Sequence, residues 1–246
     1  MNQILVTEKI YVTPELKRKK KMYKILFVIS ILLIIALFAA YIYAEYDRNK
    51  QAGISGDILS FLNKKNDTTT IGASENALVV KITQEVAQEN ENINQSSQLK
   101  MATATSKYVA PNGKEYDTIG IVKIPKINIS YPILAQTTNV ELMKVAPYKF
   151  WGANPNEVGN FCVIGHNYRR KGVFFSDVPS LNVGDIVEIQ DLSQRTVEYE
   201  VYDLHTVSPN DRSDTTQYTN GKREVTLITC TDDAKQRVIV KCTEKK

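Results

Sequence analysis

The sequence predicts an all-β domain, either a barrel or a sandwich, that follows a single membrane-spanning helix. Two patterns lead to this prediction. A run of 20 residues from Ile25 to Ala44 contains no charged side chain. From about Tyr108 onward, short stretches rich in β-branched residues alternate with Pro, Gly, Asn and Asp, as in domains built from many closely spaced strands. The hydrophobic fraction of 43% is enough for an ordinary core.

The apolar run is long enough to cross a bilayer. At about 1.5 Å per residue, a helix of this length crosses a hydrocarbon layer of roughly 30 Å. Residues 1–24 contain seven basic and two acidic residues, a net charge of +5 against +4 for the whole chain, so the remainder sums to −1. A basic cluster before an apolar span predicts a cytoplasmic N-terminus and an external C-terminal part. A cleaved signal peptide has a shorter apolar region, of about 7–15 residues. We therefore expect an uncleaved, single-pass anchor in the plasma membrane.

This distribution of charge and polarity predicts four parts. The segment after the span is polar and contains a Thr run, which is typical of a stalk with little fixed structure, although Leu78, Ile82 and Val86 have the spacing of a short amphipathic helix. The predicted parts are a cytoplasmic basic tail (1–24), a transmembrane helix (25–44), an extracytoplasmic stalk (45–107) and a β domain (108–246). Because the positive charge is concentrated in the tail, we expect no nucleic-acid partner.

Within the β domain the pattern predicts seven strands and one short helix. The helix is expected after Thr138, through Leu142 and Met143. The strands are expected near Gly120–Ile124, Ser130–Leu134, Asn160–Gly165, Ile186–Gln190, Arg195–Val207, Val225–Thr229 and Arg237–Cys242.

The three cysteines, Cys162, Cys230 and Cys242, are too few and odd in number for a disulfide framework. Cys230 stands out because it ends the alternating strand VTLITC, where the chain opens into the loop TDDAKQ. Arg237 begins the next strand, and a hairpin of this length can bring the two side chains together on one face. Cys162 and Cys242 lie within strands, where a cysteine usually serves as a small buried hydrophobic residue.

The chain has only two histidines. His166 ends the strand FCVIGH at a strand–loop junction, where catalytic groups are frequent, and we expect Gly165 to permit a tight bend there. His205 lies within a strand and is expected to fill surface or core space. Reference pKa values of about 8.5 for cysteine and 6.5 for histidine leave the thiolate–imidazolium pair at about 1% of the neutral pair. Because both side chains are then mostly neutral, His166 is suited to accept and donate a proton. A positive charge on Arg237 would disfavour a protonated His166, so Arg237 is better suited to binding a carbonyl oxygen or oxyanion.

Several of these motifs together resemble the sortases, surface enzymes of Gram-positive bacteria. TLITC at Thr226–Cys230 matches the TLxTC signature, and VIGHN, the nearby Arg237 and the run IGIVKIPKINISYPIL fit the same family. The resemblance covers roughly Tyr108 to Thr243. It implies a closed β-barrel of about eight strands with one or two short helices. It also implies catalytic functions for Cys230, His166 and Arg237, and a substrate-binding function for Thr229.

The resemblance further implies a reaction. A sorting signal similar to Leu-Pro-X-Thr-Gly is cleaved after its Thr, leaving a thioester on the cysteine, which an amine from a peptidoglycan precursor or another acceptor then resolves. The chain leaves little room for the extra helix of class B, and it shows neither the C-terminal span nor the lid of class C. We therefore expect a class A, D or E-like enzyme. Asp211 and Asp214 resemble loop acids that bind calcium in some sortases, but solvated loop acids are commoner, and we expect neither metal nor cofactor.

Two alternatives fit the residues less well. An extracytoplasmic cysteine peptidase would hydrolyse and not transfer, but papain-like peptidases place Cys before His and use an Asn or Asp as third member. A membrane-tethered β-domain that only binds a partner would contain Cys230 by chance.

Overall fold

The computed structural model describes residues 14–68 and 104–245. A long helix, α1 (Pro14–Thr68), comes first, and nine strands with short helical turns follow. The strands are β1 (Ser106–Val109), β2 (Glu115–Ile124), β3 (Ile129–Leu134), β4 (Tyr148–Gly152), β5 (Gly159–Ile164), β6 (Ile186–Asp191), β7 (Thr196–Val207), β8 (Arg223–Cys230) and β9 (Arg237–Glu244). The helical segments between them are α2 (Val140–Met143) and the 3-10 turns η1 (Pro125–Ile127), η2 (Val178–Ser180) and η3 (Ser213–Thr215).

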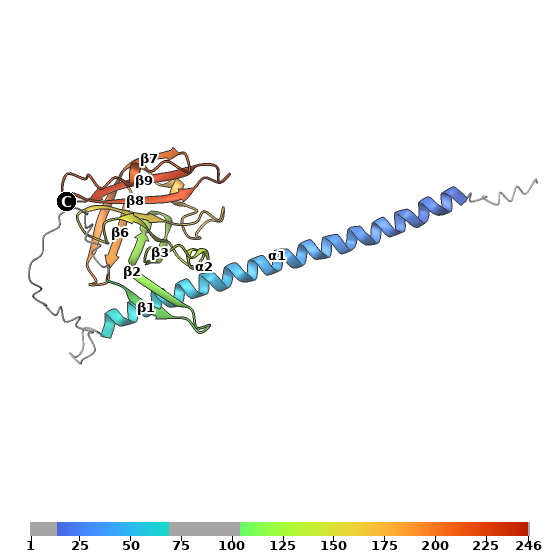
Figure 1. The fold of residues 1–246 in the computed structure, drawn as a ribbon, viewed down its shortest axis with the longest axis horizontal. Coiled ribbons are helices and arrows are strands. Elements are labelled where there is room, and N and C mark those ends of the chain that lie inside the picture. The colour runs from blue at the N-terminus through green and yellow to red at the C-terminus, as the bar shows by residue number, and fades with distance from the viewer. Residues whose placement is uncertain (1–13, 69–103, 246) are drawn as a thin grey trace, which may run out of the picture. The chain divides into compact units, whose positions relative to one another are not determined.

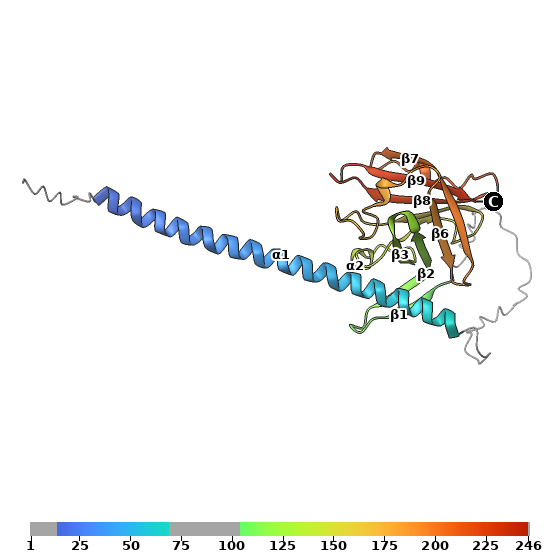
Figure 2. The same ribbon diagram turned by 180° about the vertical axis from the view of Figure 1, so that it is seen from behind.

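Strands β2 to β9 close into an eight-stranded barrel, as predicted (Figures 1 and 2). Their order around the barrel is β2-β3-β4-β5-β8-β9-β7-β6, and β6 pairs back onto β2 to close the ring. The pairs β3–β4 and β5–β8 are parallel and the others antiparallel. Closure depends on Gly120, because a Cβ atom at this position would collide with the carbonyl oxygen of Gln190 on β6.

The barrel interior is filled by alternate residues of its strands, which is the period-2 pattern of a sheet with one buried face. Val225 and Leu227 of β8 and Val238 and Val240 of β9 belong to this main core and are almost completely buried. The seven predicted strands are all present. The strands β1 and β4 were not predicted, and α2 forms where the short helix was expected.

Helix α1 extends beyond the predicted span at both ends. Its N-terminal part, up to Lys50, contains the apolar run, whose side chains are exposed. Among the described residues this is the one helix long and apolar enough to cross a membrane, which makes it a candidate anchor.

The helix also includes residues that we expected to have little fixed structure. From Gln51 onward α1 belongs to the same compact unit as the barrel, and Ile54, Ile58 and Leu62 are buried against Tyr116 and other residues of β2, β3 and the segment after α2. The first part of the predicted stalk, from Glu45 to Thr68, is therefore helical, and the expectation of little fixed structure is wrong for this part. The amphipathic segment around Leu78 lies outside the described residues.

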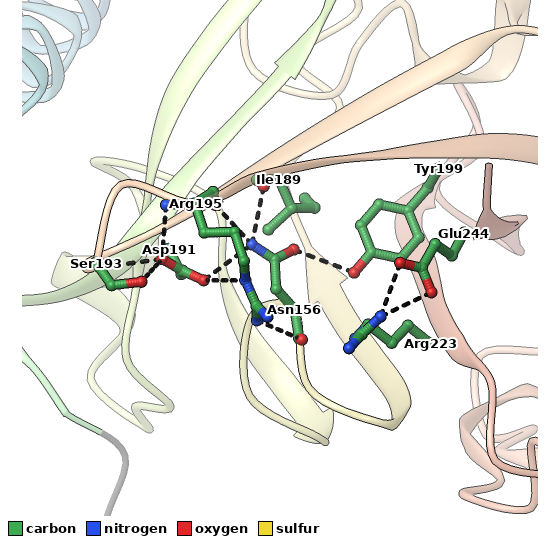
Figure 3. Close-up of polar contacts among 8 residues, drawn as sticks. All are labelled: Asn156, Ile189, Asp191, Ser193, Arg195, Tyr199, Arg223 and Glu244. Carbon is green, nitrogen blue, oxygen red and sulfur yellow. Dashed lines mark hydrogen bonds and ion pairs between the residues drawn. The ribbon is translucent and has the colours of Figure 1, made fainter. Parts of the chain in front are cut away.

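A polar network fixes one end of the barrel (Figure 3). Asn156, in the turn before β5, donates to Ile189 O and Arg195 O at 3.1 and 2.8 Å and accepts a hydrogen bond from the hydroxyl of Tyr199 at 3.1 Å. Asp191 is a further acceptor for the same amide, at 3.1 Å. The network joins the β4–β5 turn to the β6–β7 hairpin at the start of β5. His166 follows the other end of this strand, so the fixed network and the candidate site lie at opposite ends of β5.

Candidate active site

Cys230 lies at the C-terminal end of β8, on the outer face of the barrel. Val225 and Leu227 point into the main core, and Ile228 and Cys230 lie on the opposite face by alternation. The thiol is free and partly exposed, whereas the side chains of Cys162 and Cys242 are completely buried. Cys230 is therefore the cysteine, of the three, that a dissolved substrate can reach.

His166 follows β5, the strand that pairs in parallel with the strand of Cys230. The parallel pairing of β5 with β8 ends at Ile164 opposite Ile228, and the two residues lie two positions further along their chains. Gly165 N continues the pairing by donating to Ile228 O at 3.0 Å. Adjacent strands are about 4.8 Å apart, so the main chains at His166 and Cys230 are neighbours.

Arg237 is the direct cross-strand partner of Cys230. The antiparallel pairing of β8 with β9 begins with this pair, which places the two Cβ atoms about 4.5–5.5 Å apart. Arg237 as a whole is half-buried, and its Nη1 atom donates an exposed hydrogen bond to the carbonyl of Gln236 at 3.2 Å. Among the residues that the structure describes, no carboxylate forms an ion pair with Arg237. The planar N–H groups therefore stay available to an oxygen near Cys230.

These three residues border an apolar cluster on the outer face of the barrel. The cluster consists of Cys162, Ile228 and Ile239 with Phe150, Ile164 and Val207 packed against it. His166, Cys230 and Arg237 each follow or precede one of its members by two positions, so they lie on the same face. The guanidinium of Arg212, from the β7–β8 connection, stacks over Phe150 at 4.9 Å from the ring centre. The partly exposed members of the cluster are Phe150, Ile164 and Val207.

The imidazole of His166 is held in an environment that favours its neutral form. Burial of the ring, followed by the positive charge of Lys144, lowers the pKa of His166 below its ordinary value. The ring lies 5.5 Å from that of Tyr168. Its Nε2 atom is buried and has no hydrogen-bond partner among residues 14–68 and 104–245. A buried polar atom without a partner costs about 1–3 kcal/mol, which proteins tolerate most readily where function requires the atom.

Gly165 and Thr229 differ from expectation in how they support the site. Gly165 was predicted to permit a tight bend, but the actual constraint is space, since a Cβ atom there would lie 2.7 Å from the ring of Phe175. Thr229 is completely buried, and its hydroxyl donates to the carbonyl of Gly165 at 2.9 Å. This hydrogen bond gives Thr229 a structural function. Its contact with a substrate stays a prediction.

Cys162 and Cys242 are buried, as the strand pattern predicted. Burial raises the pKa of the Cys162 thiol to about 12 and also raises the pKa of Cys242, so both thiols stay protonated at neutral pH. Neither is suited to act as a nucleophile, because the thiolate is the reactive form.

His205 is part of an ion-pair cluster, contrary to the prediction that it only fills space. Its Nδ1 and Nε2 atoms lie 2.9 Å from Asp203 and 3.0 Å from Asp214, and Lys241 lies 3.5 Å from Asp214. Burial lowers the pKa of His205, but the hydrogen bond and charge of Asp214 and then those of Asp203 outweigh it, so the pKa is raised. The carboxylate of Asp214 thus faces these cations, and that of Asp211 accepts from Ser213 N at 2.9 Å.

The sequence did not single out Asn167, which contacts the segment of Cys230 directly. Its side-chain amide donates to the main-chain carbonyl of Cys230 at 2.9 Å. The only sequence signal was its position next to His166 in VIGHN. The partner lies 63 residues away, and a single sequence contains no information on such a pairing.

A reachable thiol, a neutral imidazole and an unpaired guanidinium at adjacent strand ends can perform acyl transfer. The thiol supplies a nucleophile, the imidazole can accept and return a proton, and the guanidinium can stabilise an oxyanion. The fold and these residue types fit the class of β-barrel cysteine acyl transferases.

The chain belongs to the sortase family. Residues 122–245 match the sortase domain, which is half of the chain. Sortase A of Bacillus anthracis is 35% identical over 127 residues, which cover 49% of this chain and 57% of that protein. The chain thus matches less than two thirds of the length of this relative.

Solved structures of sortases are similar to this chain. A Clostridium perfringens sortase D5 transpeptidase is 28% identical, covers 53% of this chain and 80% of its own, and has a TM-score of 0.48. A C. perfringens sortase C with the C-terminal cell wall sorting motif is 25% identical, covers 54% and 73%, and also has a TM-score of 0.48. Both scores are below 0.5, and the barrel is established here by the strand pairings of the chain itself. Proteins named sortase A, C and D all match, so these likenesses do not separate the classes.

Proposed function

We propose that this chain is a membrane-anchored transpeptidase that cleaves an LPXTG-like sorting signal of surface proteins and transfers the acyl group to a cell-wall amine. The observation that carries the proposal is the register of three neighbouring strand ends. Cys230 and Arg237 are cross-strand partners, and His166 and Cys230 each lie two residues beyond the last pair of the parallel β5–β8 ladder. Family membership supports the class of reaction.

In the first step, Cys230 Sγ attacks the carbonyl carbon of the peptide bond after the Thr of the signal. The thiol proton passes to His166, and the carbonyl oxygen becomes an oxyanion beside Arg237. The C–N bond then breaks, and the leaving amine takes the proton from His166. The product of this step is a thioester between the substrate Thr and Cys230.

In the second step, an acceptor amine attacks the thioester carbon. The amine loses a proton to His166, the C–S bond breaks, and the sulfur leaves with the proton that His166 returns. The net reaction exchanges one amide bond for another and needs no redox partner. The lowered pKa of His166 supports this scheme, because a neutral imidazole can accept a proton at each attack.

The apolar cluster beside the thiol supports an LPXTG-like signal. The Leu and Pro of such a signal would pack on Phe150, Ile164 and Val207, the partly exposed members of this cluster, and Thr229 would support the site through its hydrogen bond to Gly165. The C. perfringens sortase C described with a sorting motif is a relative for which such a ligand is named. The acceptor is proposed to be an amine of a peptidoglycan precursor.

We place the N-terminus in the cytoplasm and the barrel outside the plasma membrane. The basic residues Lys17–Lys21 and Lys24 precede the apolar part of α1, which supports this orientation. We also favour a class A, D or E-like enzyme. In the described β7–β8 connection, the only helical element is the three-residue turn η3, which argues against class B with its extra helix there.

The full-length chain in detergent micelles, incubated with sorting-signal peptides and candidate amines, tests the proposal by mass spectrometry. We expect the peptide up to its Thr joined to the amine, and a transient acyl adduct on Cys230. Cys230→Ala should abolish both. Cys242→Ala, which changes a buried cysteine of the interior, should retain turnover in the folded fraction and cost stability instead.

The alternatives predict other products. Free acid with every amine would identify a hydrolase, and an intact peptide would identify a binding module. Turnover above a few per cent in Cys230→Ala would reject the nucleophile assignment.

A further inference from the structure

The side chain of Asn167 makes three hydrogen bonds, two of which reach the segment of the nucleophile. Its Nδ2 group donates to Cys230 O at 2.9 Å and to Asp232 Oδ1 at 3.0 Å. Its Oδ1 atom accepts from Arg169 N at 2.8 Å. If the amide were flipped, its oxygen would face the two acceptor oxygens of Cys230 and Asp232, so these partners determine the orientation of the amide. Both N–H groups and the oxygen of the amide therefore have a hydrogen-bond partner.

These bonds extend the contact between β5 and β8 beyond the last pair of the ladder. The Thr229 hydroxyl binds the carbonyl of Gly165, and the Asn167 amide binds the carbonyl of Cys230. His166 lies between Gly165 and Asn167 in the chain, so it is held on both sides. Cys230 is held between Asn167 on one side and its partner Arg237 on β9 on the other.

Proton transfer at this site requires the imidazole of His166 to stay within about 2.6–3.2 Å of the group that gives or takes the proton. A misplacement of about 1 Å in such an arrangement can cost roughly 10²-fold in rate. We propose that Asn167 is a positioning residue that sets the main chain of His166 against that of Cys230, an inference that rests on the proposed transpeptidase function. The Asn167 amide binds the main-chain carbonyl of Cys230, so we assign it a positioning function and not a catalytic one.

A purely local function for Asn167 makes a different prediction. The bond from Arg169 N to Oδ1 is an Asx turn, which Asp forms as well as Asn. Asn167→Asp keeps the shape and this acceptor but loses both donors. It also places a carboxylate against Cys230 O and the carboxylate of Asp232. The local function therefore predicts that Asp substitutes for Asn, whereas the positioning function predicts that it fails.

The experiment compares Asn167→Asp and Asn167→Ala with the wild type, all as full-length chains in detergent micelles. Ser176→Ala is the matched control, because it removes another hydrogen bond of the loop after His166, from Tyr168 N to Ser176 Oγ at 2.9 Å, without affecting Cys230 O. For each chain, kcat and KM are measured with a sorting-signal peptide and an amine, together with the rate of Cys230 alkylation at high pH. The alkylation rate reports access to the thiol and does not need His166.

We expect kcat to fall at least tenfold in both Asn167 variants, with KM and the high-pH alkylation rate within twofold of the wild type. Ser176→Ala should keep its kcat within twofold. Wild-type kcat in Asn167→Asp would overturn the inference while leaving the transpeptidase function intact. Loss of folding in both Asn167 variants would also overturn it, because the residue would then be structural. An inactive wild type would overturn the proposed function and this inference together.

Discussion

Replacing Arg237 by Lys separates two functions that the guanidinium can have. Arg237 is the cross-strand partner of Cys230, and its one hydrogen bond within residues 14–68 and 104–245, to Gln236 O at 3.2 Å, leaves most of its N–H groups unused there. It can bind the oxyanion through directed hydrogen bonds, or its charge can favour the Cys230 thiolate. Lys keeps the charge and loses the planar fork.

The two functions differ in expected magnitude. Loss of one oxyanion donor typically costs about 10²–10³ in turnover, or roughly 2.7–4 kcal/mol. The charge on its own acts at a partly exposed position, where ion pairs typically contribute about 0–1 kcal/mol. Lys retains nearly all of this second contribution, because its ammonium carries the same charge on a side chain of similar length. Only the directed hydrogen bonds are lost.

The assay measures turnover of a sorting-signal peptide by the full-length Arg237→Lys chain and the rate of Cys230 alkylation as a function of pH. We expect turnover to fall at least tenfold and the alkylation profile to stay nearly unchanged. Arg223→Lys is the matched control, since Arg223 lies at the other end of the same strand pair, where it binds Glu244 at 2.7 and 2.9 Å. Its turnover should stay near the wild-type value.

Near-normal turnover in Arg237→Lys would refute the oxyanion function. The alkylation profile of Arg237→Ala would then decide whether the charge acts on the thiolate, because loss of that charge would shift the profile to higher pH.

Three further predictions follow from the fold and the surrounding charges. Ile58→Ala should lower the free energy of unfolding of the barrel unit by about 2–5 kcal/mol in urea titration, because Ile58 is completely buried where the helix packs on the barrel. Ser60→Ala, at an exposed position of the same helix, is the control. An effect of Ile58→Ala no larger than that of the control would contradict the packing. The pKa of His205 is raised in the folded state, so its stabilising contribution is complete below the unfolded pKa of about 6.5 and is lost as pH rises through the folded pKa. The difference in Tm between wild type and His205→Gln should therefore be largest at acidic pH and shrink above about 6.5; a difference that grows with pH would contradict the sign. Finally, protease added to intact, wall-stripped cells should cut between Glu45 and Lys107, and full protection would contradict an external barrel.

Features that depend on local contacts could be predicted from the sequence. Alternating residues such as Val225 and Leu227 indicated the strands, and the apolar run indicated the helix within α1. The pairing of Cys230 with Arg237 was also predictable, because a short hairpin joins them and leaves few alternative registers. The docking of α1 on the barrel was missed, although Ile54, Ile58 and Leu62 have helical spacing. The sequence does not show which surface these three apolar residues contact, and within a polar segment they therefore did not indicate burial.

Features that depend on distant contacts were decided by the tertiary structure. The four-residue strand β1 and the strand β4 have too little pattern of their own and are stabilised by pairing with β2 and β5. The closure of the barrel joins Gly120 to Asp191, and the register of β5 with β8 brings His166 beside Cys230. Family resemblance anticipated the second contact, but local pattern could not. Asn167 shows the reason most clearly, since the sequence around an amide is the same whether it faces water or the carbonyl of a cysteine 63 residues away. Only the pairing of distant strands determines which carbonyl it meets.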